Sequence, residues 1–371
     1  MKKILLYTDT PQVGGAELQM FLLAKFLDRS KFKVLLACSK NAKLDSWCQN
    51  FLNEGLSVQR LNVIHKHDPR HFTQLKGIIK KEQIDLLHLH IWNPASCRYA
   101  LAIKSIPKII SEHDPFKLSG LKDVYKKHAL KQVSSIVAIS NNNAELLKEL
   151  YPDQSKKITV IHNGIDISWW QSQTFSFSQK ERKEMKEDLF YAREDTLIVL
   201  NIAELHERKG QEYLILAIPK VVEKFPNIKF VFVGEGPNRY ELENLVLKNK
   251  IERHVTFTGR QKNIPKILKS ADIFCLPSRR EAFGMVNLEA MISGLPVIAS
   301  RTGGIPEVVS SAGILVEPEN PNALSKALLL LIQDPTIRAE LADVGKERVI
   351  SQFSAKTMAE KYEKIYEKIL G

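Results

Sequence analysis

Short apolar runs alternate with amphipathic, helix-prone segments along nearly the whole chain. Strands that alternate with helices indicate βαβ units and a parallel sheet, so the pattern predicts two doubly wound α/β units. In the first half, strands are expected near residues 3–9, 33–39, 57–62, 85–90, 108–113, 134–140 and 157–162, with helices such as 15–28 and 141–150. In the second half, strands are expected near residues 196–203, 228–234, 255–258, 271–276, 295–299 and 313–316.

A turn and a polar stretch separate the two halves. Segment 163–166, Asn-Gly-Ile-Asp, has the composition of a turn that leaves a strand, and a polar, helix-prone stretch follows it. A chain of 371 residues also exceeds what one hydrophobic core usually serves. We therefore expect one domain at residues 1–170 and a second at 171–352. The amphipathic pattern of residues 353–371 predicts a C-terminal helix.

Composition narrows the class of protein. A hydrophobic content of 44% and a charged content of 26% are typical of a globular protein. No apolar stretch approaches the ~20 residues of a membrane-spanning helix, and the N-terminus leads directly into a predicted strand, so we expect a cytoplasmic protein. The cysteines have no metal-ligand spacing and are expected to be reduced thiols: Cys38, Cys48, Cys97 and Cys275.

The positive charge is concentrated in the first half. Residues 1–170 hold 25 Lys and Arg against 15 Asp and Glu, which accounts for +10 of the net charge of +12. Such a balance suits nucleic acid, an anionic membrane or a phosphorylated substrate. The sequence has no nucleic-acid motif and no basic cluster interleaved with aromatic residues, so no nucleic-acid partner is expected.

One segment carries much of this charge. Residues 116–132 include five Lys and one Asp, and apolar residues from Leu121 to Leu130 fall near helical spacing, which predicts a helix with its lysines on the outer face. An ordinary solvated helix and a peripheral contact with an anionic membrane both fit this pattern.

The most informative segment follows the apolar run 273–277. Glu281 lies in the turn after this predicted strand, and a helix expected over residues 285–293 carries Glu289 in its second turn. The free N–H groups at a helix N-terminus attract anions. Two carboxylates beside such a site suit a nucleotide sugar, with one for the ribose and one for the transferred sugar. Ordinary surface acids are the alternative, which the flanking small residues and the apolar run 295–300 make less favourable.

This segment resembles the signature of the retaining glycosyltransferases of family 4, which have the GT-B fold. That signature is Glu, seven residues, Glu, usually with Phe-Gly after the first acid and Glu-Ala-Met at the second. The same residue types stand here at Glu281, Phe283, Gly284, Glu289, Ala290 and Met291. The resemblance covers the whole chain. It implies two Rossmann-like domains facing across a cleft, the first binding the acceptor and the second the nucleotide sugar, with the last helix crossing back to the first.

Two basic residues follow the strand expected at 196–203. Arg208 and Lys209 lie in a strand-to-helix turn, where they can clamp a diphosphate, Arg as a fork and Lys as a point charge. Pairing with Glu204 and Glu207 in a solvated turn is the alternative. Relatives usually have an Arg where this chain has Glu204, and a Lys before the Gly. The resemblance therefore implies Lys209 as a phosphate ligand, with Arg208 in place of the missing arginine.

No metal or other cofactor is expected. Asp-x-Asp does not occur among the fourteen aspartates, so cationic side chains and helix N-termini are expected to offset the charge of the leaving diphosphate. His65, His67 and His71 suggest a metal site, but their neighbours favour an exposed loop that enters a helix.

Glycine-containing turns end several predicted strands. Gly14 and Gly15 permit close approach of an anion to the next helix, although a plain tight turn fits them equally and the dinucleotide fingerprint is absent. The resemblance places these glycines beside the donor phosphates. Gly234 ends another strand on the same edge, and Arg260 stands where relatives hold the base.

Three histidines lie near strand ends in the first half. His88 and His90 share one face by the period of two, and they fit interior histidines. His113 is last on its strand and faces a Pro-containing loop. The resemblance implies that His113 reaches the donor sugar near its anomeric carbon, whereas a structural role is the alternative.

These expectations describe a retaining, metal-independent glycosyltransferase of the hexosyltransferase type. It would move a sugar from a nucleoside-diphosphate sugar to a hydroxyl of a glycan or lipid-linked acceptor in cell-surface polysaccharide or glycolipid synthesis. A non-catalytic GT-B subunit, or another GT-B enzyme such as a sugar-nucleotide epimerase, remains an alternative. The expected catalytic residues are His113, Arg208, Lys209 and Glu281. The expected donor-binding residues are Gly14, Gly15, Gly234, Arg260, Phe283, Gly284, Met285, Val286 and Glu289.

Overall fold

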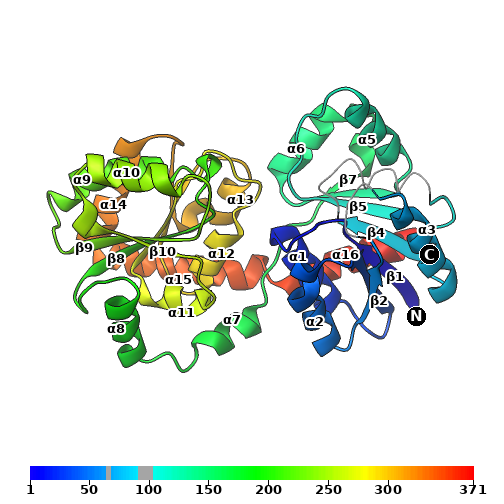
Figure 1. The fold of residues 1–371 in the computed structure, drawn as a ribbon, viewed down its shortest axis with the longest axis horizontal. Helices are drawn as coiled ribbons and strands as arrows, with labels where there is room; N and C mark the ends of the chain where they lie inside the picture. Colours follow the sequence, from blue (N-terminus) through cyan, green and yellow to red (C-terminus); the bar gives the residue numbers. More distant parts are fainter. Residues whose placement is uncertain (64–67, 91–102) are drawn as a thin grey trace. The chain divides into compact units, whose positions relative to one another are not determined.

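The computed structural model describes residues 1–63, 68–90 and 103–371. The chain forms two compact units, residues 1–164 with 355–371 and residues 165–354, and each contains a sheet covered by helices (Figure 1). The division falls a few residues before position 170 because Ile165 belongs to the second unit. Its N–H donates to the Phe353 carbonyl at 2.9 Å, and Ile165 forms a β-bridge with Ser354.

The described strands of the first unit form one parallel sheet in the order β3-β2-β1-β4-β5-β6-β7. The strand order reverses between β1 and β4, and ligands of such sheets bind at the carboxyl ends of strands near this reversal. The strands are β1 Lys2–Tyr7, β2 Phe32–Ser39, β3 Ser57–Leu61, β4 Leu86–His90, β5 Lys108–Glu112, β6 Ser135–Ala138 and β7 Ile158–Val160.

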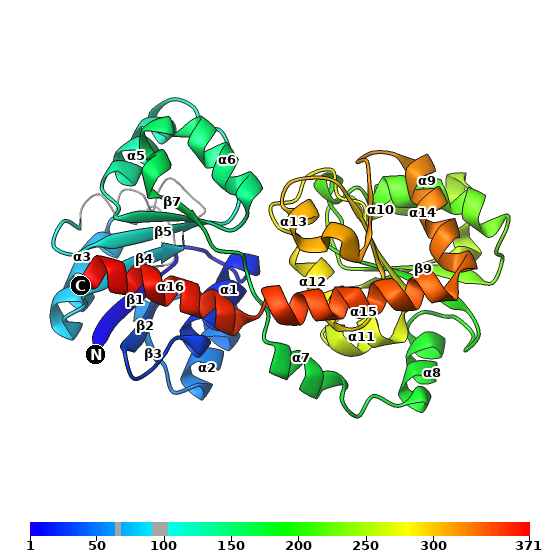
Figure 2. The ribbon, with the colours of Figure 1, turned by 180° about the vertical axis from the view of Figure 1, so that it is seen from behind.

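Helices cover both faces of this sheet. Apolar residues of α1, α2 and the C-terminal α16 share one core, and those of α3, α5 and α6 share the other. Figure 2 shows α16 in red beside α1. The helices are α1 Gly15–Phe26, α2 Asp45–Asn53, α3 Arg70–Glu82, α5 Leu121–Lys131, α6 Asn141–Leu150 and α16 Ala355–Leu370, with 3-10 turns η1 Ala42–Leu44 and η2 Pro152–Lys157.

The second unit repeats the plan, with a parallel sheet in the order β10-β9-β8-β11-β12-β13. Its order reverses between β8 and β11. The strands are β8 Leu197–Ile202, β9 Ile228–Val233, β10 Val255–Gly259, β11 Ile273–Leu276, β12 Val297–Ser300 and β13 Ile314–Val316. The helices are α7 Ile167–Thr174, α8 Gln179–Asp188, α9 Gln211–Val222, α10 Arg239–Lys248, α11 Ile264–Ser270, α12 Met285–Ile292, α13 Ile305–Val309, α14 Pro321–Gln333 and α15 Pro335–Gln352, with 3-10 turns η3 Glu207–Lys209, η4 Glu252–His254 and η5 Ser310–Ala312.

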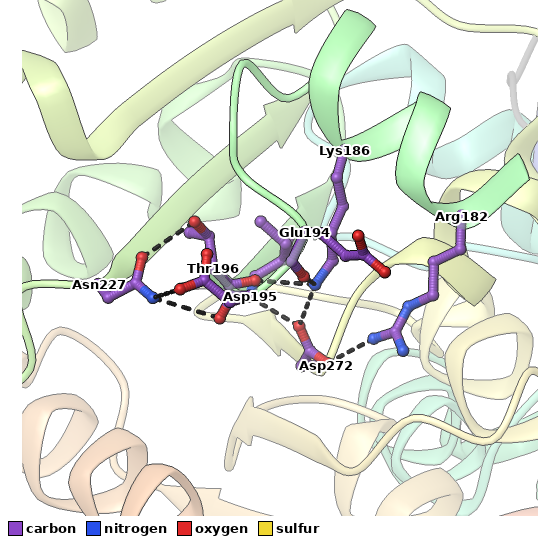
Figure 3. A network of polar contacts seen from close by, with 8 residues as sticks. Arg182, Lys186, Glu194, Asp195, Thr196, Asn227 and Asp272 are labelled. Carbon is purple, nitrogen blue, oxygen red and sulfur yellow. Dashed lines mark hydrogen bonds and ion pairs between the residues drawn. The ribbon is translucent and has the colours of Figure 1, made fainter. Parts of the chain in front are cut away.

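A polar network fastens α8 to the amino ends of β8 and β11 (Figure 3). Asp272, just before β11, accepts a hydrogen bond from Arg182 at 2.6 Å and lies 3.5 Å from the ammonium of Lys186. The buried Lys186 also donates to the carbonyls of Glu194 at 3.1 Å and Thr196 at 2.8 Å. A buried ammonium is costly unless it is paired and hydrogen-bonded. These contacts tie α8 to the amino edge of the sheet.

The histidines at positions 65, 67 and 71 were expected in an exposed loop that enters a helix, and for His71 this prediction of exposure is wrong. His71 is fully buried, and its Nδ1 lies 3.0 Å from the hydroxyl of Tyr7, so it is an interior histidine with a partner. His65 and His67 lie outside the described residues, as does Cys97. In the part of the chain that the structure describes, no group of three His, Cys, Asp or Glu is placed to hold a metal ion.

Candidate active site

Two loops meet at the carboxyl edge of the second sheet, where the strand order reverses. The loop after β8 and the loop after β11 are joined because the backbone N–H groups of Arg279 and Arg280 donate to the Arg208 carbonyl, at 2.9 and 3.2 Å. Gly210 allows this approach. It has a φ of +64°, and a Cβ at this position would lie 2.1 Å from the carbonyl oxygen of Pro277.

The same loops bring two predicted catalytic residues together. The ammonium of Lys209 forms an ion pair with the carboxylate of Glu281, and each side chain is 15% exposed. Ser278 lies 3.5 Å from the same carboxylate oxygen. Solvent and salt screen a partly buried pair less than a surface pair. A ligand that draws one partner away must therefore provide a replacement for the other.

A third loop supports Glu281 from the neighbouring strand β12. Gly303 has a φ of +53°, and a Cβ there would lie 1.7 Å from the Glu281 carbonyl oxygen. The N–H of Gly304 donates to that oxygen at 3.3 Å. These two glycines were missed in the sequence analysis, although adjacent glycines two residues after the run 295–300 were a visible signal. They fix the backbone of the glutamate.

Arg208 was expected to bind phosphate, but in this structure its side chain is paired with a carboxylate. Its guanidinium donates to Glu204 at 3.2 Å, and both side chains are about half exposed. Glu207 pairs with Arg279 rather than with Lys209. The alternative of pairing within the turn therefore holds for Arg208 and Glu204, but not for Lys209. The phosphate-binding role of Arg208 stays a prediction.

Helix α12 carries the second predicted carboxylate. It begins after Gly284, whose φ is +84°, while the side chain of Phe283 is buried against Phe353 with ring centroids 6.1 Å apart. The side chain of Phe283 thus belongs to the interior, whereas Met285 and Val286 are half-buried.

Glu289 lies in the second turn of α12 and is half-buried by its accessible surface. Its carboxylate has no hydrogen-bond or ion-pair partner among the described residues. Removal from water raises the pKa of Glu289 to about 7, because burial disfavours the charged form. Hydroxyl donors from a ligand would stabilise the charged form of such a carboxylate.

The other predicted donor residues of this unit extend along the same edge. Gly234, after β9, has a φ of +142°, and a Cβ there would lie 2.0 Å from the Ala203 carbonyl oxygen. Its N–H donates to the Gly259 carbonyl at 2.9 Å. Close packing of the chain alone therefore requires glycine at 234. Arg260 follows β10 and is exposed.

The glycine loop of the first unit contains an unforeseen acid. The N–H of Gly14 donates to the buried Glu17 at 2.9 Å, and the hydroxyl of Thr8 donates to the same carboxylate at 3.2 Å. Burial raises the pKa of Glu17. Gly15 is different: a Cβ there would meet nothing within 4 Å, and its φ is not positive. The local backbone does not require glycine at 15, which leaves room for close approach by a ligand.

His113 follows β5 of the first unit and is half-buried. Its Nε2 lies 3.2 Å from Nδ1 of His90, which is itself buried, as is His88. Burial lowers the pKa of His113 to about 4, so its imidazole is neutral at physiological pH.

The predicted orientation of the lysine-rich helix α5 is right for its C-terminal half, where Ala129 and Leu130 are buried and Lys127 is exposed, but wrong for Lys126 and for the N-terminal apolar residues. Lys126 faces inward and is 8% exposed, with its ammonium 2.6 Å from the buried Glu112 at the end of β5. The apolar Leu121 and Val124 instead are exposed, at 74% and 52%. A buried carboxylate needs a counter-charge, and this requirement determines which face of α5 is buried. Lys122 remains exposed beside the apolar residues.

The chain has the GT-B fold. Solved structures with the same fold include that of the Anabaena protein HepE with UDP and glucose, at a TM-score of 0.83 and 22% identity over 99% of this chain and 100% of that one. A glycosyltransferase from Rickettsia africae has a TM-score of 0.86 and 21% identity, covering 100% and 98%. The predicted fold class, two Rossmann-like α/β domains, is confirmed.

Family models identify the group. The model for Glycosyltransferase Family 4 matches residues 13–169, and that for Glycosyl transferases group 1 matches residues 182–348. Among curated relatives, N-acetyl-alpha-D-glucosaminyl L-malate synthase of Bacillus anthracis is 26% identical over 98% of this chain and 96% of its own length. Spore coat protein SA of Bacillus subtilis is 26% identical over 99% and 100%. The chain belongs to the group 1 glycosyltransferases of family 4, as the signature predicted.

Gly303 and Gly15 should respond in opposite ways to alanine. Gly303→Ala places a Cβ against the backbone of Glu281 at a positive φ, so we expect loss of at least about 1 kcal/mol of stability, seen as a lower melting temperature. Gly15→Ala should keep the wild-type melting temperature, because its Cβ enters open space, yet weaken binding or transfer of substrate. A Gly15→Ala protein with unaltered kinetics would remove this loop from the ligand site.

Proposed function

We propose that this protein transfers a sugar from a nucleoside-diphosphate sugar to an acceptor hydroxyl, with retention at the anomeric carbon and without a metal ion. The observation that carries the proposal is the Lys209–Glu281 pair at the strand reversal of the second unit, in the turn that leads into α12. A cation, a carboxylate and a helix N-terminus suit a ligand with both phosphates and hydroxyls.

Names of similar proteins support a nucleotide-sugar donor. HepE of Anabaena was solved with UDP-glucose. A relative in Escherichia coli is named for UDP-Gal, and one in Corynebacterium glutamicum is named as GDP-mannose-dependent. These relatives use different bases and sugars. We therefore propose the donor class and leave its base and sugar open.

The residues then take distinct roles as the bond between the anomeric carbon and the phosphate oxygen breaks. Charge accumulates on the leaving diphosphate, where Lys209 and the N–H groups at the start of α12 stabilise it. Glu281 accepts hydrogen bonds from sugar hydroxyls and Glu289 from the ribose. The leaving phosphate takes the proton of the acceptor on the same face, so no protein nucleophile is needed. Metal independence rests on the lack of Asp-x-Asp and on these cationic and N–H groups.

A glycan or lipid-linked acceptor is supported by the printed names of two relatives. The Escherichia coli relative acts on a diphosphoundecaprenol-linked sugar, and a Schizosaccharomyces pombe relative is a subunit of a phosphatidylinositol N-acetylglucosaminyltransferase. We propose an acceptor of this kind, in cell-surface polysaccharide or glycolipid synthesis, and a peripheral position at the cytoplasmic membrane leaflet. In the described parts of the chain, no helix has the length and apolar character needed to cross a bilayer.

Substitution of Glu281 and Lys209 tests the enzyme directly. Glu281→Gln should lower turnover about 10²-fold or more while the protein stays folded, since a neutral amide gives weaker hydrogen bonds in the transition state. Lys209→Ala should in addition weaken binding of the bare nucleoside diphosphate. The turnover of both variants is measured by release of nucleoside diphosphate with and without acceptor, and with a chelator present.

Several outcomes would contradict this assignment. Near-wild-type turnover of Glu281→Gln would exclude it from the mechanism, and loss of activity in chelator would overturn metal independence. Donor binding without any turnover would favour a non-catalytic binding module, whereas turnover of donor without acceptor would favour a different GT-B enzyme. Arg208→Ala should weaken diphosphate binding only if Arg208 replaces the usual arginine. A silent Arg208→Ala together with a more active Glu204→Arg would exclude that replacement.

Donor affinity should rise with pH through about 7. Below this pH Glu289 is protonated and accepts ribose hydroxyls less well, so binding of a nucleotide sugar at pH 6 should be about ten-fold weaker than at pH 8. A nucleotide sugar is the proper probe, because its diphosphate does not titrate in this range. In Glu289→Gln the affinity should be weak and independent of pH.

The stability of the protein should depend on the protonation of Glu289 in the opposite direction from donor affinity. Folded Glu289 keeps a proton that the unfolded chain releases at its ordinary pKa of 4.5, so its contribution to the free energy of unfolding falls as pH rises from 4.5 to about 7 and is constant above.

A pH-dependent donor affinity retained in Glu289→Gln would assign the titration to another group.

The exposed apolar end of α5 should direct membrane binding. Anionic vesicles should sediment the protein at low salt and release it at high salt. Lys117→Gln with Lys122→Gln should weaken this binding about ten-fold or more, since each lysine near an anionic surface contributes about 1 kcal/mol. Lys80→Gln with Lys81→Gln, exposed on α3, removes the same charge from the same unit and should have little effect. An equal loss of vesicle binding in both double variants, or equal binding to neutral vesicles, would contradict a specific contact through α5.

A further inference from the structure

A chain of polar side chains lies inside the apolar face of the first sheet that α16 covers. Nδ1 of His88 lies 2.7 Å from the hydroxyl of Tyr366, and its Nε2 lies 2.8 Å from the hydroxyl of Ser111. Ser111 in turn lies 2.8 Å from the hydroxyl of Tyr362. Both ring nitrogens of His88 therefore have partners, and this histidine is held in place by strand β5 and helix α16.

His90 is the next inward-facing residue of β4, and it connects this layer to His113. Its ring centroid lies 4.3 Å from that of His88 and 5.4 Å from that of His113, with the last two rings stacked at 26°. Its Nδ1 lies 3.2 Å from Nε2 of His113. Its other nitrogen, Nε2, is buried and has no hydrogen-bond partner among the described residues.

The three imidazoles are neutral in the folded protein. Desolvation lowers the pKa of His88 to about 3 and that of His113 to about 4, and burial together with the neighbouring rings lowers the pKa of His90 far below its ordinary value. One proton therefore lies between Nδ1 of His90 and Nε2 of His113, and either ring can be its donor.

The burial of His90 distinguishes the two arrangements. If His113 donates from Nε2, the proton of His90 must sit on its own Nε2, which leaves a buried N–H with no acceptor among the described residues. If His90 donates from Nδ1, its Nε2 carries only a lone pair. Buried N–H groups without an acceptor are rarer in proteins than under-satisfied acceptors. The second arrangement is therefore favoured.

We infer that His90 is a positioning residue that donates from Nδ1 to Nε2 of His113 and thereby fixes the proton of His113 on Nδ1. His113 then meets the substrate as a hydrogen-bond donor, through Nδ1–H, and does not act as a base at that atom. The group that it recognises is an oxygen with a free lone pair, a sugar hydroxyl or a phosphate oxygen. The part concerning the substrate rests on the proposed function, whereas the tautomer of His113 does not.

The tautomer is measured in the full chain by long-range ¹H–¹⁵N correlation with ¹⁵N-labelled histidine. The His113 signals are assigned by their loss in His113→Gln. The wild type should show His113 with its proton on Nδ1. The opposite tautomer in the wild type overturns the inference without any variant at position 90.

Two variants of similar shape isolate the donated hydrogen bond. His90→Asn places an amide where Nδ1 was, so His113 should keep its proton on Nδ1 and transfer should stay near wild type. His90→Leu has nearly the same outline without a donor, so the tautomer of His113 should become mixed and turnover should fall about ten-fold, the scale of one hydrogen bond. An unchanged tautomer in a folded His90→Leu protein overturns the positioning role.

The two arms of the experiment fail separately. A changed tautomer in His90→Leu with undiminished transfer supports the contact between the two histidines and overturns the donor role of His113 toward substrate. No transfer by the wild type with any nucleotide sugar overturns the proposed function and that donor role, while the spectrum still decides the tautomer.

Discussion

The ion pair between Lys209 and Glu281 is the contact on which the candidate site depends. It joins loops from two strands that are adjacent in the sheet but distant along the chain, β8 and β11. Glycines at positions 210 and 303 let three backbones approach closely enough to form it. Because both charged groups are mostly removed from solvent, each stabilises the other until a ligand offers phosphate to one and hydroxyls to the other.

The two edges of the second sheet have separate tasks. At the amino edge, the buried Lys186 and the ion pair between Arg182 and Asp272 have local partners that tie α8 to the strands. At the carboxyl edge, Glu289 has none among the described residues and its pKa is raised accordingly. A buried carboxylate without a counter-charge at the reversal of strand order, and paired charges at the opposite edge, is the distribution expected of a fold that binds ligands at its carboxyl edge.

Most of the fold was predictable because parallel sheets produce short apolar runs at regular intervals, and every predicted strand is present. The position of Glu281 in a turn and of Glu289 on a helix also followed from local pattern. Contacts between segments that are distant along the chain could not be predicted from local pattern. Lys126 faces inward only because Glu112 is buried beneath it, and Glu17 occupies the N–H of Gly14 from within α1. The close approach of Gly303 to Glu281 likewise depends on strand neighbours that periodicity does not specify.

Donor binding in such a site is an exchange of partners more than an addition of charge. Arg208 is already paired with Glu204, and Lys209 with Glu281. A diphosphate that recruits Lys209 releases Glu281, which can then accept hydrogen bonds from hydroxyls of the sugar attached to that diphosphate. A bare phosphate would draw the lysine away and leave a half-buried carboxylate without a partner, which is costly. The pair therefore favours a ligand that has a phosphate and a sugar in one molecule over either part alone.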